Sequence, residues 1–411
     1  MRRVVVTGIG LTSPAGKTVD EFWKNLNEGR NFVVECDSMI DMGLKSSSHA
    51  LIEDKSHLYK YSDKLDNFIK FGLYAGESAW KDSGLDIYSI QDESRIGLIS
   101  SSAIGGTQTV ADKFEELLVN DNIIFNNNDS HFYDSGMYHT LNVLLKRKLG
   151  IKGITTALST GCTAGMDCLG LGFEEIIDGD LDICMIGASE APLVNFTYAT
   201  LDVIGCLSKN TSDYASCPFS LDRNGFVISE GSAFLVLEEY NHAKDRNAKI
   251  YAEVEDFHSI NNGNHMTNLK SDGLDMYELL NILFKKRKET TIDYINAHGS
   301  STKQNDLFET EAYKKFFGKD IYRIPISSTK SMIGHSLSSA SLFGCISAIM
   351  SIVTSKIHPT INLNNNDEKC DLNYVPNYSI NKTVNNALVT ASGFGGIHSA
   401  VILKKVKEEG E

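Results

Sequence analysis

The chain has 411 residues, of which 42% are hydrophobic and 22% charged, enough apolar material for one large core or two smaller ones. Its formal net charge of −14 argues against nucleic acid as the main partner, because phosphate binding needs a basic surface. No stretch approaches the ~20 apolar residues of a membrane span, and the first residues do not form a secretory signal, so we expect a soluble, cytoplasmic protein without membrane association.

Short apolar runs alternate with longer amphipathic stretches, which predicts an α/β fold. Buried strands are predicted at residues 2–10, 94–102, 153–159, 181–188, 231–240, 292–299, 386–396 and 398–406. Helices are predicted at residues 19–29, 68–84, 164–179 and 309–318. The pattern occurs twice, so we predict a duplicated unit whose halves, residues 1–250 and 251–411, form one compact body. Two polar stretches, residues 120–134 and 208–222, predict long loops of the kind that often carry function.

The first candidate site is the turn around Cys162. A predicted strand ends at Ser159, a tight turn follows, and a helix rich in small residues begins. Free backbone N–H groups and the positive end of the helix dipole would lower the pKa of a thiol there and hold an oxyanion. A lone cysteine in such a segment is more often a core residue. We assign that role to the other seven cysteines, none of which forms a CxxC pair.

Two further motifs place histidines beside turns. His298 ends a predicted strand and enters a loop that contains Ser300 and Thr302. Lys330 and His335 flank a short turn that leads into a helix of small residues. Taken singly, a hydrogen-bonded loop histidine, a capping hydroxyl and a surface lysine explain these residues as well.

A glycine-flanked aromatic completes the set. Phe394 lies between two predicted strands in a segment whose spacing does not fit a dinucleotide fingerprint but suits a mobile gate. A cysteine with two histidines differs from the set of a cysteine protease. Two neutral imidazoles can stabilise an enolate while the thiolate holds an acyl group, which is the chemistry of decarboxylation followed by Claisen condensation.

Together these motifs resemble the β-ketoacyl-acyl-carrier-protein synthases of the thiolase superfamily over essentially the full length of the chain. The nucleophile, first-histidine, lysine–histidine and glycine-phenylalanine motifs are matched, in order, by STGCTAGMD, NAHGSSTKQND, STKSMIGHS and SGFGG, and CPFSLDRNGFVISEG also matches. NHMTNLKSDG and CDLNYVP resemble one branch in particular, the ketosynthase α subunits of type II aromatic polyketide synthases. The resemblance implies a thiolase-like fold, with duplicated α/β halves in a five-layered αβαβα core.

The resemblance also implies catalytic roles. Cys162 would carry the growing acyl chain, while His298 and His335 would promote malonyl decarboxylation and stabilise the enolate. Lys330 would orient this network, which a further pair of acidic residues would support, namely Asp306 and Glu309.

Substrate contacts follow from the same resemblance. The backbone N–H groups of Cys162 and Phe394 would form the oxyanion hole, and Phe394 would be the gatekeeper between the acyl and malonyl sites. Ser300 and Thr302 would contact the phosphopantetheine arm. No resident cofactor or metal is implied, because phosphopantetheine arrives on the carrier protein.

The implied function is the ketosynthase α subunit of a type II polyketide synthase, an acyltransferase that condenses malonyl-carrier units repeatedly with a Cys-bound chain. Its implied partners are a chain-length factor, as a heterodimer, and an acyl carrier protein. Because carrier proteins are acidic, the basic clusters at residues 146–148 and 285–288 are candidate docking sites.

Three alternatives share parts of this pattern. A 3-oxoacyl-carrier-protein synthase II of fatty-acid elongation has the same chemistry. A chain-length-factor-like partner would lack the nucleophile, and a degradative thiolase would have a second active cysteine near the C-terminus. The chain departs from the resembled branch at Lys303, where arginine is frequent, and at Ser338 and Ser339, which replace Gly-Ala.

Overall fold

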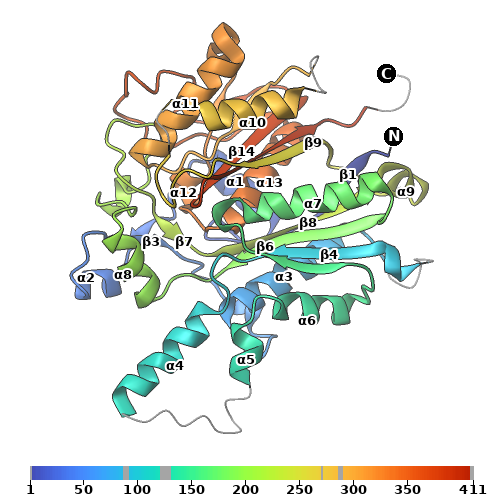
Figure 1. Ribbon diagram of the computed structural model, residues 1–411, viewed down its shortest axis with the longest axis horizontal. Helices are drawn as coiled ribbons and strands as arrows, with labels where there is room; N and C mark the ends of the chain where they lie inside the picture. The colour runs from blue at the N-terminus through green and yellow to red at the C-terminus, as the bar shows by residue number, and fades with distance from the viewer. Residues whose placement is uncertain (1, 87–91, 121–130, 270–271, 286–289, 408–411) are drawn as a thin grey trace.

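The computed structural model describes residues 2–86, 92–120, 131–269, 272–285 and 290–407. Within them, ten strands form one mixed sheet in the order β11-β10-β14-β15-β9-β1-β8-β6-β4-β5 (Figure 1). The strands of the first half are β1 (Val4–Thr12), β4 (Ile96–Ser101), β5 (Thr155–Leu158), β6 (Ile183–Glu190) and β8 (Gly231–Glu239). Those of the second half are β9 (Ala252–Asn261), β10 (Tyr294–Asn296), β11 (Ile326–Ser327), β14 (Asn386–Gly393) and β15 (Ile397–Lys404).

The two halves of the sheet repeat the same topology outward from its centre. In the first half, β1–β8 and β8–β6 pair antiparallel, and β6–β4 and β4–β5 pair parallel. In the second half, β9–β15 and β15–β14 are antiparallel, and β14–β10 and β10–β11 are parallel. The antiparallel pairing of β1 with β9 joins the halves. The predicted duplicated α/β fold is therefore confirmed, while the boundary at residue 250 stays a prediction.

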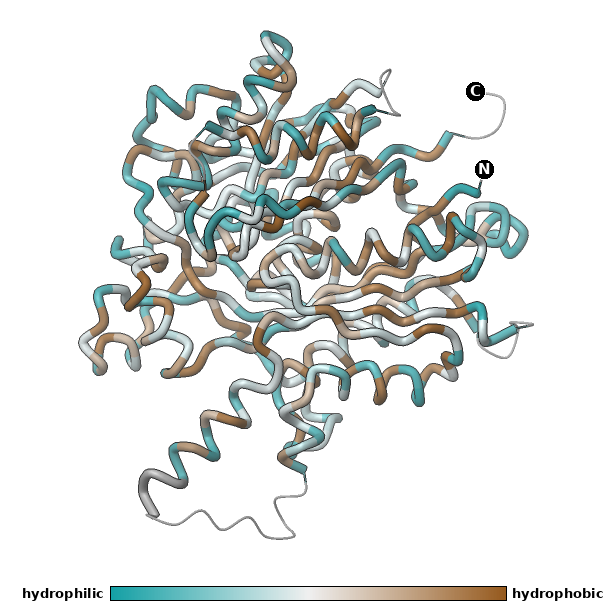
Figure 2. Tube along the Cα trace, viewed as in Figure 1, coloured by the Kyte–Doolittle hydropathy of each residue, from teal (hydrophilic) through white to brown (hydrophobic). Residues whose placement is uncertain are grey.

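Helices separate and cover the two halves. Between them lie α7 (Ala164–Asp178) and α13 (Ser339–Thr354), which pack against each other and against strands of both halves. α3 (Asn67–Asp82) and α6 (Thr140–Leu149) cover the outer face of the first half, and α10 (Leu274–Phe284) and α11 (Lys303–Phe317) cover that of the second. α13 contains no charged residue, and Ser339–Ile352 are all buried, as expected of a helix enclosed between two layers of sheet. Figure 2 shows hydrophobic residues gathered along the central strands and helices.

The remaining elements lie around the ends of this core. They are α1 (Val19–Asn27), β2 (Val34–Glu35), α2 (Asp37–Asp41), β3 (Ser48–Ala50), α4 (Thr107–Asn120), α5 (His131–Gly136), α8 (Asn195–Val203), β7 (Ile228–Ser229), α9 (Tyr240–Asp245), α12 (Lys330–Ile333), β12 (Lys356–Ile357) and β13 (Ile380–Asn381). α4 and α5 project from the body, whereas α2, α8, β3 and β7 lie together at one end (Figure 1). In the described part of the chain, every helix is too short or too polar to cross a membrane.

Most predicted elements are confirmed, and two strands of the large sheet were missed. The eight predicted strands overlap β1, β4, β5, β6, β8, β10, β14 and β15, with ends that differ by up to two residues in β1 and β6. β9 was missed because acidic residues interrupt its apolar pattern. One of them, Glu253, is buried and pairs with Arg3 at 2.6 Å. Of the first predicted loop, residues 121–130 lie outside the described residues, and the prediction is wrong for residues 131–134, which belong to α5. The second, residues 208–222, is irregular apart from a short 3-10 turn, Ser212–Tyr214.

Candidate active site

A cavity of ≈ 340 Å³ opens where β5, β10 and β14 end. The motifs that the sequence singled out converge here, because their strands all finish at this edge of the sheet. Six of the predicted site residues line the cavity: Cys162, His298, Ser300, Thr302, His335 and Phe394. The other three, Lys330, Asp306 and Glu309, are buried behind the wall.

The turn before α7 presents Cys162 to this cavity. Gly161 has a φ of +67°, and a Cβ there would meet nothing within 4 Å, so its glycine serves backbone conformation and not close packing. Asp167, one turn into the helix, accepts hydrogen bonds from the hydroxyls of Thr160 and Thr163. Its other carboxylate oxygen accepts from Ser399 of β15 at 2.5 Å. Asp167 therefore fixes the turn that carries Cys162 to the second half of the molecule.

Burial, and not the helix end, dominates the ionisation of Cys162. It raises the pKa of the thiol to about 11, although the charge of Lys330 and the N–H groups of Phe394 and Cys162 lower it. The predicted lowering of this pKa is therefore wrong for the free enzyme, since desolvation of the thiolate outweighs the favourable contacts. The thiol is protonated at neutral pH. Both backbone N–H groups that were predicted to form the oxyanion hole do lie against the sulfur.

The two histidines face one another in the cavity wall. Their ring centroids are 5.2 Å apart in a T-shaped arrangement. Nδ1 of His335 accepts a hydrogen bond from the N–H of Leu337 at 3.1 Å, so in the neutral ring Nε2 carries the proton. Burial, assisted by the charge of Lys330, holds the pKa of both histidines well below its ordinary value. Both imidazoles are therefore neutral.

Lys330 begins α12 and connects the two histidine motifs. Its Nζ donates to the backbone carbonyl oxygen of His298 at 2.6 Å. Burial lowers the pKa of this lysine to about 8, against the opposing influence of Glu309, Cys162 and Asp306. The ammonium group therefore acts on His298 through its backbone and on both rings through its charge.

Glu309 organises the loop that carries His298. One carboxylate oxygen accepts the N–H of His298 at 2.8 Å, and the other accepts that of Gly299 at 2.7 Å. The hydroxyls of Tyr313 and Thr390 also donate to it, each at 2.9 Å. The position of His298 thus depends on the carboxylate of Glu309, which lies 11 residues later in the chain.

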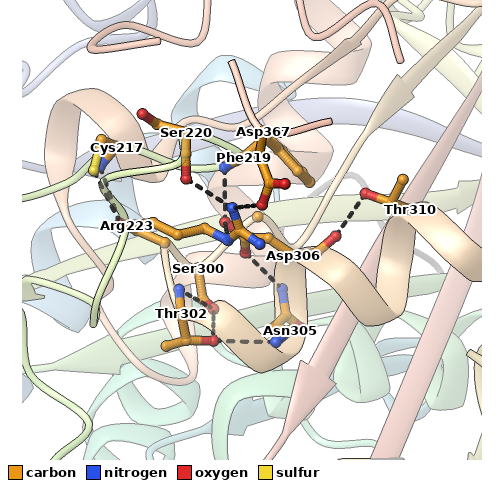
Figure 3. Close-up of polar contacts among 12 residues, drawn as sticks. Cys217, Phe219, Ser220, Arg223, Ser300, Thr302, Asn305, Asp306, Thr310 and Asp367 are labelled. Carbon is orange, nitrogen blue, oxygen red and sulfur yellow. Dashed lines mark hydrogen bonds and ion pairs between the residues drawn. The ribbon is translucent and has the colours of Figure 1, made fainter. Parts of the chain in front are cut away.

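Asp306 takes part in a neighbouring network that is built around a buried arginine (Figure 3). It accepts the N–H of Phe219 at 2.8 Å. Arg223 donates to Ser220 and Asp367, each at 2.7 Å, while its Nε lies 3.8 Å from Asp306. Burial raises the pKa of Asp306 to about 6 although Arg223 lowers it. This network anchors the segment that continues into the cavity wall at residues 224–226.

Ser300 and Thr302 lie at the start of α11, beside that network. Their hydroxyl oxygens are 3.0 Å apart, and the Thr302 hydroxyl accepts the N–H of Asn305 at 3.3 Å as the helix N-cap. Both also line the cavity. Thr302 therefore caps α11, and both hydroxyl-bearing residues also line the cavity that a ligand would enter.

Comparison with known proteins decides the family. Residues 1–243 match the N-terminal domain of beta-ketoacyl synthases and residues 251–364 match the C-terminal domain. The chain belongs to the beta-ketoacyl synthase family. It is 36% identical to the tetracenomycin polyketide synthase ketoacyl synthase alpha subunit of Streptomyces glaucescens, over 99% of this chain and 98% of that protein. The predicted resemblance is confirmed, and the protein is an acyltransferase that forms carbon–carbon bonds.

Solved ketosynthase structures agree with this assignment. One, of a type II polyketide synthase acyl-carrier protein in complex with its ketosynthase bound to the hexaketide, has a TM-score of 0.92 at 37% identity. Another, the ishigamide ketosynthase/chain length factor, has a TM-score of 0.90 at 26% identity. Each covers 99% of this chain, and the chain covers 100% of each.

A further buried carboxylate adjoins the ketosynthase site, and sequence reasoning missed it. Glu190 ends β6 and accepts hydrogen bonds from the N–H of Ala103, from Ser102 at 3.2 Å and from the Ser338 hydroxyl at 2.5 Å. Burial raises its pKa to about 7. Ser338, one of the residues that replace Gly-Ala, therefore ties the start of α13 to the half that carries Cys162.

The described residues of the two predicted basic clusters, 146–148 and Lys285, do not line the ketosynthase cavity. Residues 146–148 end α6 on the outer face of the first half, and Lys148 pairs with Glu77 at 2.6 Å. Of the second cluster, residues 286–288 lie outside the described residues. Lys303 does line the cavity, at the start of α11.

Proposed function

We propose that the chain is the ketosynthase α subunit of a type II polyketide synthase and condenses malonyl units repeatedly with a chain held on Cys162. One observation carries the mechanism: Cys162 and two neutral imidazoles share a single cavity. A neutral imidazole with a proton on Nε2 can donate a hydrogen bond to an oxygen on which negative charge develops.

The first step is transfer of the acyl chain. The sulfur of Cys162 attacks the thioester carbonyl of the loaded carrier, and the N–H groups of Cys162 and Phe394 stabilise the oxyanion. The carbon–sulfur bond to the carrier breaks, and the departing thiolate takes up the proton that Cys162 loses. Burial raises the pKa of the free thiol to about 11, so the protonated thiol is the form from which this proton must be lost.

The second step is condensation. Loss of carbon dioxide from the malonyl thioester places negative charge on its carbonyl oxygen, which His298 and His335 stabilise by hydrogen bonds. The enolate carbon attacks the acyl carbonyl on Cys162, the carbon–sulfur bond breaks, and the thiol re-forms on protonation. Glu309 and Lys330 hold the backbone of His298, so they position this donor without contacting substrate.

The cavity rim supports the proposed substrate contacts. The hydroxyls of Ser300 and Thr302 face a phosphopantetheine arm as it enters. Phe394 is 39% exposed, an unusual position for a phenylalanine, and it lies over Cys162 on a turn of glycines. It is therefore free to swing between an acyl and a malonyl position.

The chain-length factor is the proposed partner, bound along the outer edge of β5. In the described part of the chain, β5 pairs with β4 on one side and with no strand on the other. Its residues are half-buried, and the projecting α4 and α5 carry exposed aromatic residues, Phe114 and Tyr133. Such an edge is a template for strand pairing with a second chain. The ketosynthase/chain length factor neighbour and the carrier-protein complex support this assembly and a carrier protein as the second partner.

We also propose a cytoplasmic location. All eight cysteines are free thiols. A chain with this many cysteines and no disulfide among them is typical of a reducing compartment.

Co-expression tests the proposal. The chain alone is expected to be poorly soluble or inactive, and a chain-length factor together with a malonyl-loaded carrier protein is expected to restore polyketide synthesis. In the restored complex, Cys162→Ala should lower chain extension on the order of 1,000-fold or more while malonyl decarboxylation persists.

Cys206→Ser is the matched control, because this second thiol lines the same cavity but has no proposed role. It should retain extension. A stable homodimer that elongates fatty acyl chains would contradict the polyketide assignment, and continued extension by Cys162→Ala would contradict the nucleophile.

A further inference from the structure

One buried polar residue of the cavity wall has no part in the mechanism above. Asn305, in the first turn of α11, lines the cavity together with Thr302 but is only 4% exposed. Figure 3 shows it beside Asp306, at the start of the same helix. Because a buried amide needs hydrogen-bond partners, its contacts indicate why the chain places an asparagine here.

The amide nitrogen of Asn305 bridges two buried carboxylates. Nδ2 donates to Oδ1 of Asp306 at 3.2 Å and to Oε2 of Glu309 at 2.9 Å. Both acidic residues are 0% exposed, and they lie three residues apart on one face of the helix, where like charges repel each other. The two N–H groups of the amide serve one carboxylate each and so reduce this repulsion.

The oxygen of the same amide shows that the bridge sets its orientation. Oδ1 of Asn305 is buried and has no hydrogen-bond partner among the described residues. Turning the amide by 180° would place this oxygen against two carboxylates and would break both hydrogen bonds. The side chain therefore leaves an acceptor unsatisfied in order to keep Nδ2 between Asp306 and Glu309.

The bridge extends to the loop that carries His298. Oε2 of Glu309, which accepts from Asn305, also accepts the N–H of Gly299 at 2.7 Å. Oε1 of the same carboxylate accepts the N–H of His298 at 2.8 Å. Without the amide, repulsion from Asp306 would displace Glu309, and the backbone of His298 would follow it.

We propose that Asn305 is a positioning residue of the condensation: its amide holds the carboxylates of Asp306 and Glu309 together and so fixes His298 where it stabilises the enolate. This role rests on the proposed function, because it acts through His298. It requires an uncharged side chain with two donors between the two acids, which neither an apolar residue nor a carboxylate supplies.

The bridge is needed only while both carboxylates are charged. Burial raises the pKa of Asp306 to about 6, and the charge of Glu309 acts in the same direction, whereas Asn305 opposes both. Asp306 is therefore ionised at pH 7.5 and largely protonated at pH 5.5. Loss of the amide should matter at the higher pH, and it should matter little at the lower one.

Other ionisable groups face Asp306 from the elements packed against it. They are Cys217 and Arg223 before β7, Lys330 of α12, and Cys370 and Tyr374 before β13. Burial raises the pKa of both thiols to about 11 and that of the tyrosine well above its ordinary value, and it lowers the pKa of the lysine to about 8. These groups largely keep their protons from pH 5.5 to pH 7.5, so a change over this range reports on the carboxylates.

Decarboxylation of a malonyl-loaded carrier protein by the enzyme, with its partner where solubility needs it, tests this role. In Asn305→Leu, kcat should fall on the order of tenfold at pH 7.5, as expected for lost hydrogen bonds to charged groups. KM for the carrier should stay within about twofold, because a positioning residue makes no contact with it. At pH 5.5 the loss in kcat relative to wild type should be less than about threefold. Acylation of Cys162, a step that does not use His298, should keep its wild-type rate and shows that the variant is folded.

Two further variants separate the bridge from packing. Asn305→Asp keeps the shape of the side chain but removes the bridging amide, so it should lose kcat at pH 7.5 at least as strongly as Asn305→Leu, and it keeps the test open if the leucine variant does not fold. Asn281→Leu, the same substitution at an exposed position of α10, is the control and should behave as wild type.

Three results overturn the proposal: an equal loss in kcat at both pH values, a change confined to KM, or a wild-type rate in Asn305→Asp. Absence of malonyl decarboxylation from the wild-type enzyme would instead contradict the proposed function, on which this role rests.

Discussion

At the scale of single residues, burial sets the charge states of the site more strongly than neighbouring charges do. It raises the pKa of Glu190 to about 7 and that of Asp306 to about 6, and lowers that of Lys330 to about 8. Burial makes the charged form of each group costly in the folded protein, so ionisation of these groups opposes folding.

Glu190→Gln tests this opposition. The folded pKa of about 7 lies above the ordinary 4.5, so the contribution to stability is full below pH 4.5 and is lost as the pH rises through 7. At pH 8 the ionised group costs on the order of 3 kcal/mol. Glutamine keeps an acceptor for Ala103 and gives Ser102 a donor. Thermal melts should show the variant more stable than wild type at pH 8, with little difference at pH 5.

The exposed Glu368→Gln serves as the control and should show no such pH dependence. If Glu190→Gln were equally destabilised at pH 8 and at pH 5, ionisation of Glu190 would cost no stability. That result would contradict the raised pKa of this carboxyl group.

Residues of the proposed site divide into those that sequence could predict and those that it could not. Cys162, His298 and His335 stand in local motifs, each beside a strand end, so position along the chain was informative. Asp167 and Glu190 act by contacts across the fold, to Ser399 and Ser338 respectively, and only the three-dimensional structure brings these together. The spacing of Thr163 and Asp167, four residues apart on one helix, was the single local signal available.

At the scale of elements, the turn between β14 and β15 shows how the segment that carries Phe394 is held. The N–H of Gly395 donates to Met266 at 2.6 Å, and the carbonyl of Gly396 accepts the N–H of Asn262 at 2.9 Å. Both glycines have positive φ, of 85° and 75°. The segment that follows β9 therefore anchors the turn that carries Phe394. The hydrophobic pattern of the sequence did not predict β9.

Two alanine substitutions separate conformation from packing in this turn. Each adds strain of about 1–2 kcal/mol from its positive φ. In Gly396→Ala the new Cβ would also lie 2.0 Å from Asn262 Oδ1, whereas in Gly395→Ala it meets nothing within 4 Å. We expect Gly396→Ala to lower chain extension several-fold more than Gly395→Ala, measured with malonyl- and acyl-loaded carriers. Equal losses of chain extension in the two variants would mean that Asn262 does not hold the turn that carries Phe394.

At the scale of the whole molecule, the free edge of β5 predicts how a partner is bound. The N–H of Leu98 bonds to the carbonyl of Ile154, so the alternation of a parallel ladder turns the N–H of Ala157 outward. Proline is tolerated at such an edge position, where it removes a donor to the partner without removing a bond inside the sheet.

Ala157→Pro should therefore weaken assembly while leaving the fold intact. Sedimentation of the complex with the chain-length factor is expected to show dissociation, and circular dichroism should match wild type. Lys148→Ala, at an exposed position near the end of α6, is the control and should not change assembly. Unchanged sedimentation of the proline variant would place the partner elsewhere.

The repeated topology has a consequence for how the chemistry was divided. Cys162 lies between β5 and α7, and His335 lies at the equivalent point of the second repeat, between β11 and α13. One copy of the repeat thus contributes the sulfur and the other contributes both imidazoles. Either copy alone would therefore hold only part of the proposed catalytic set. The antiparallel pairing of β1 with β9 joins the two copies in one sheet, so that both parts meet at a single cavity.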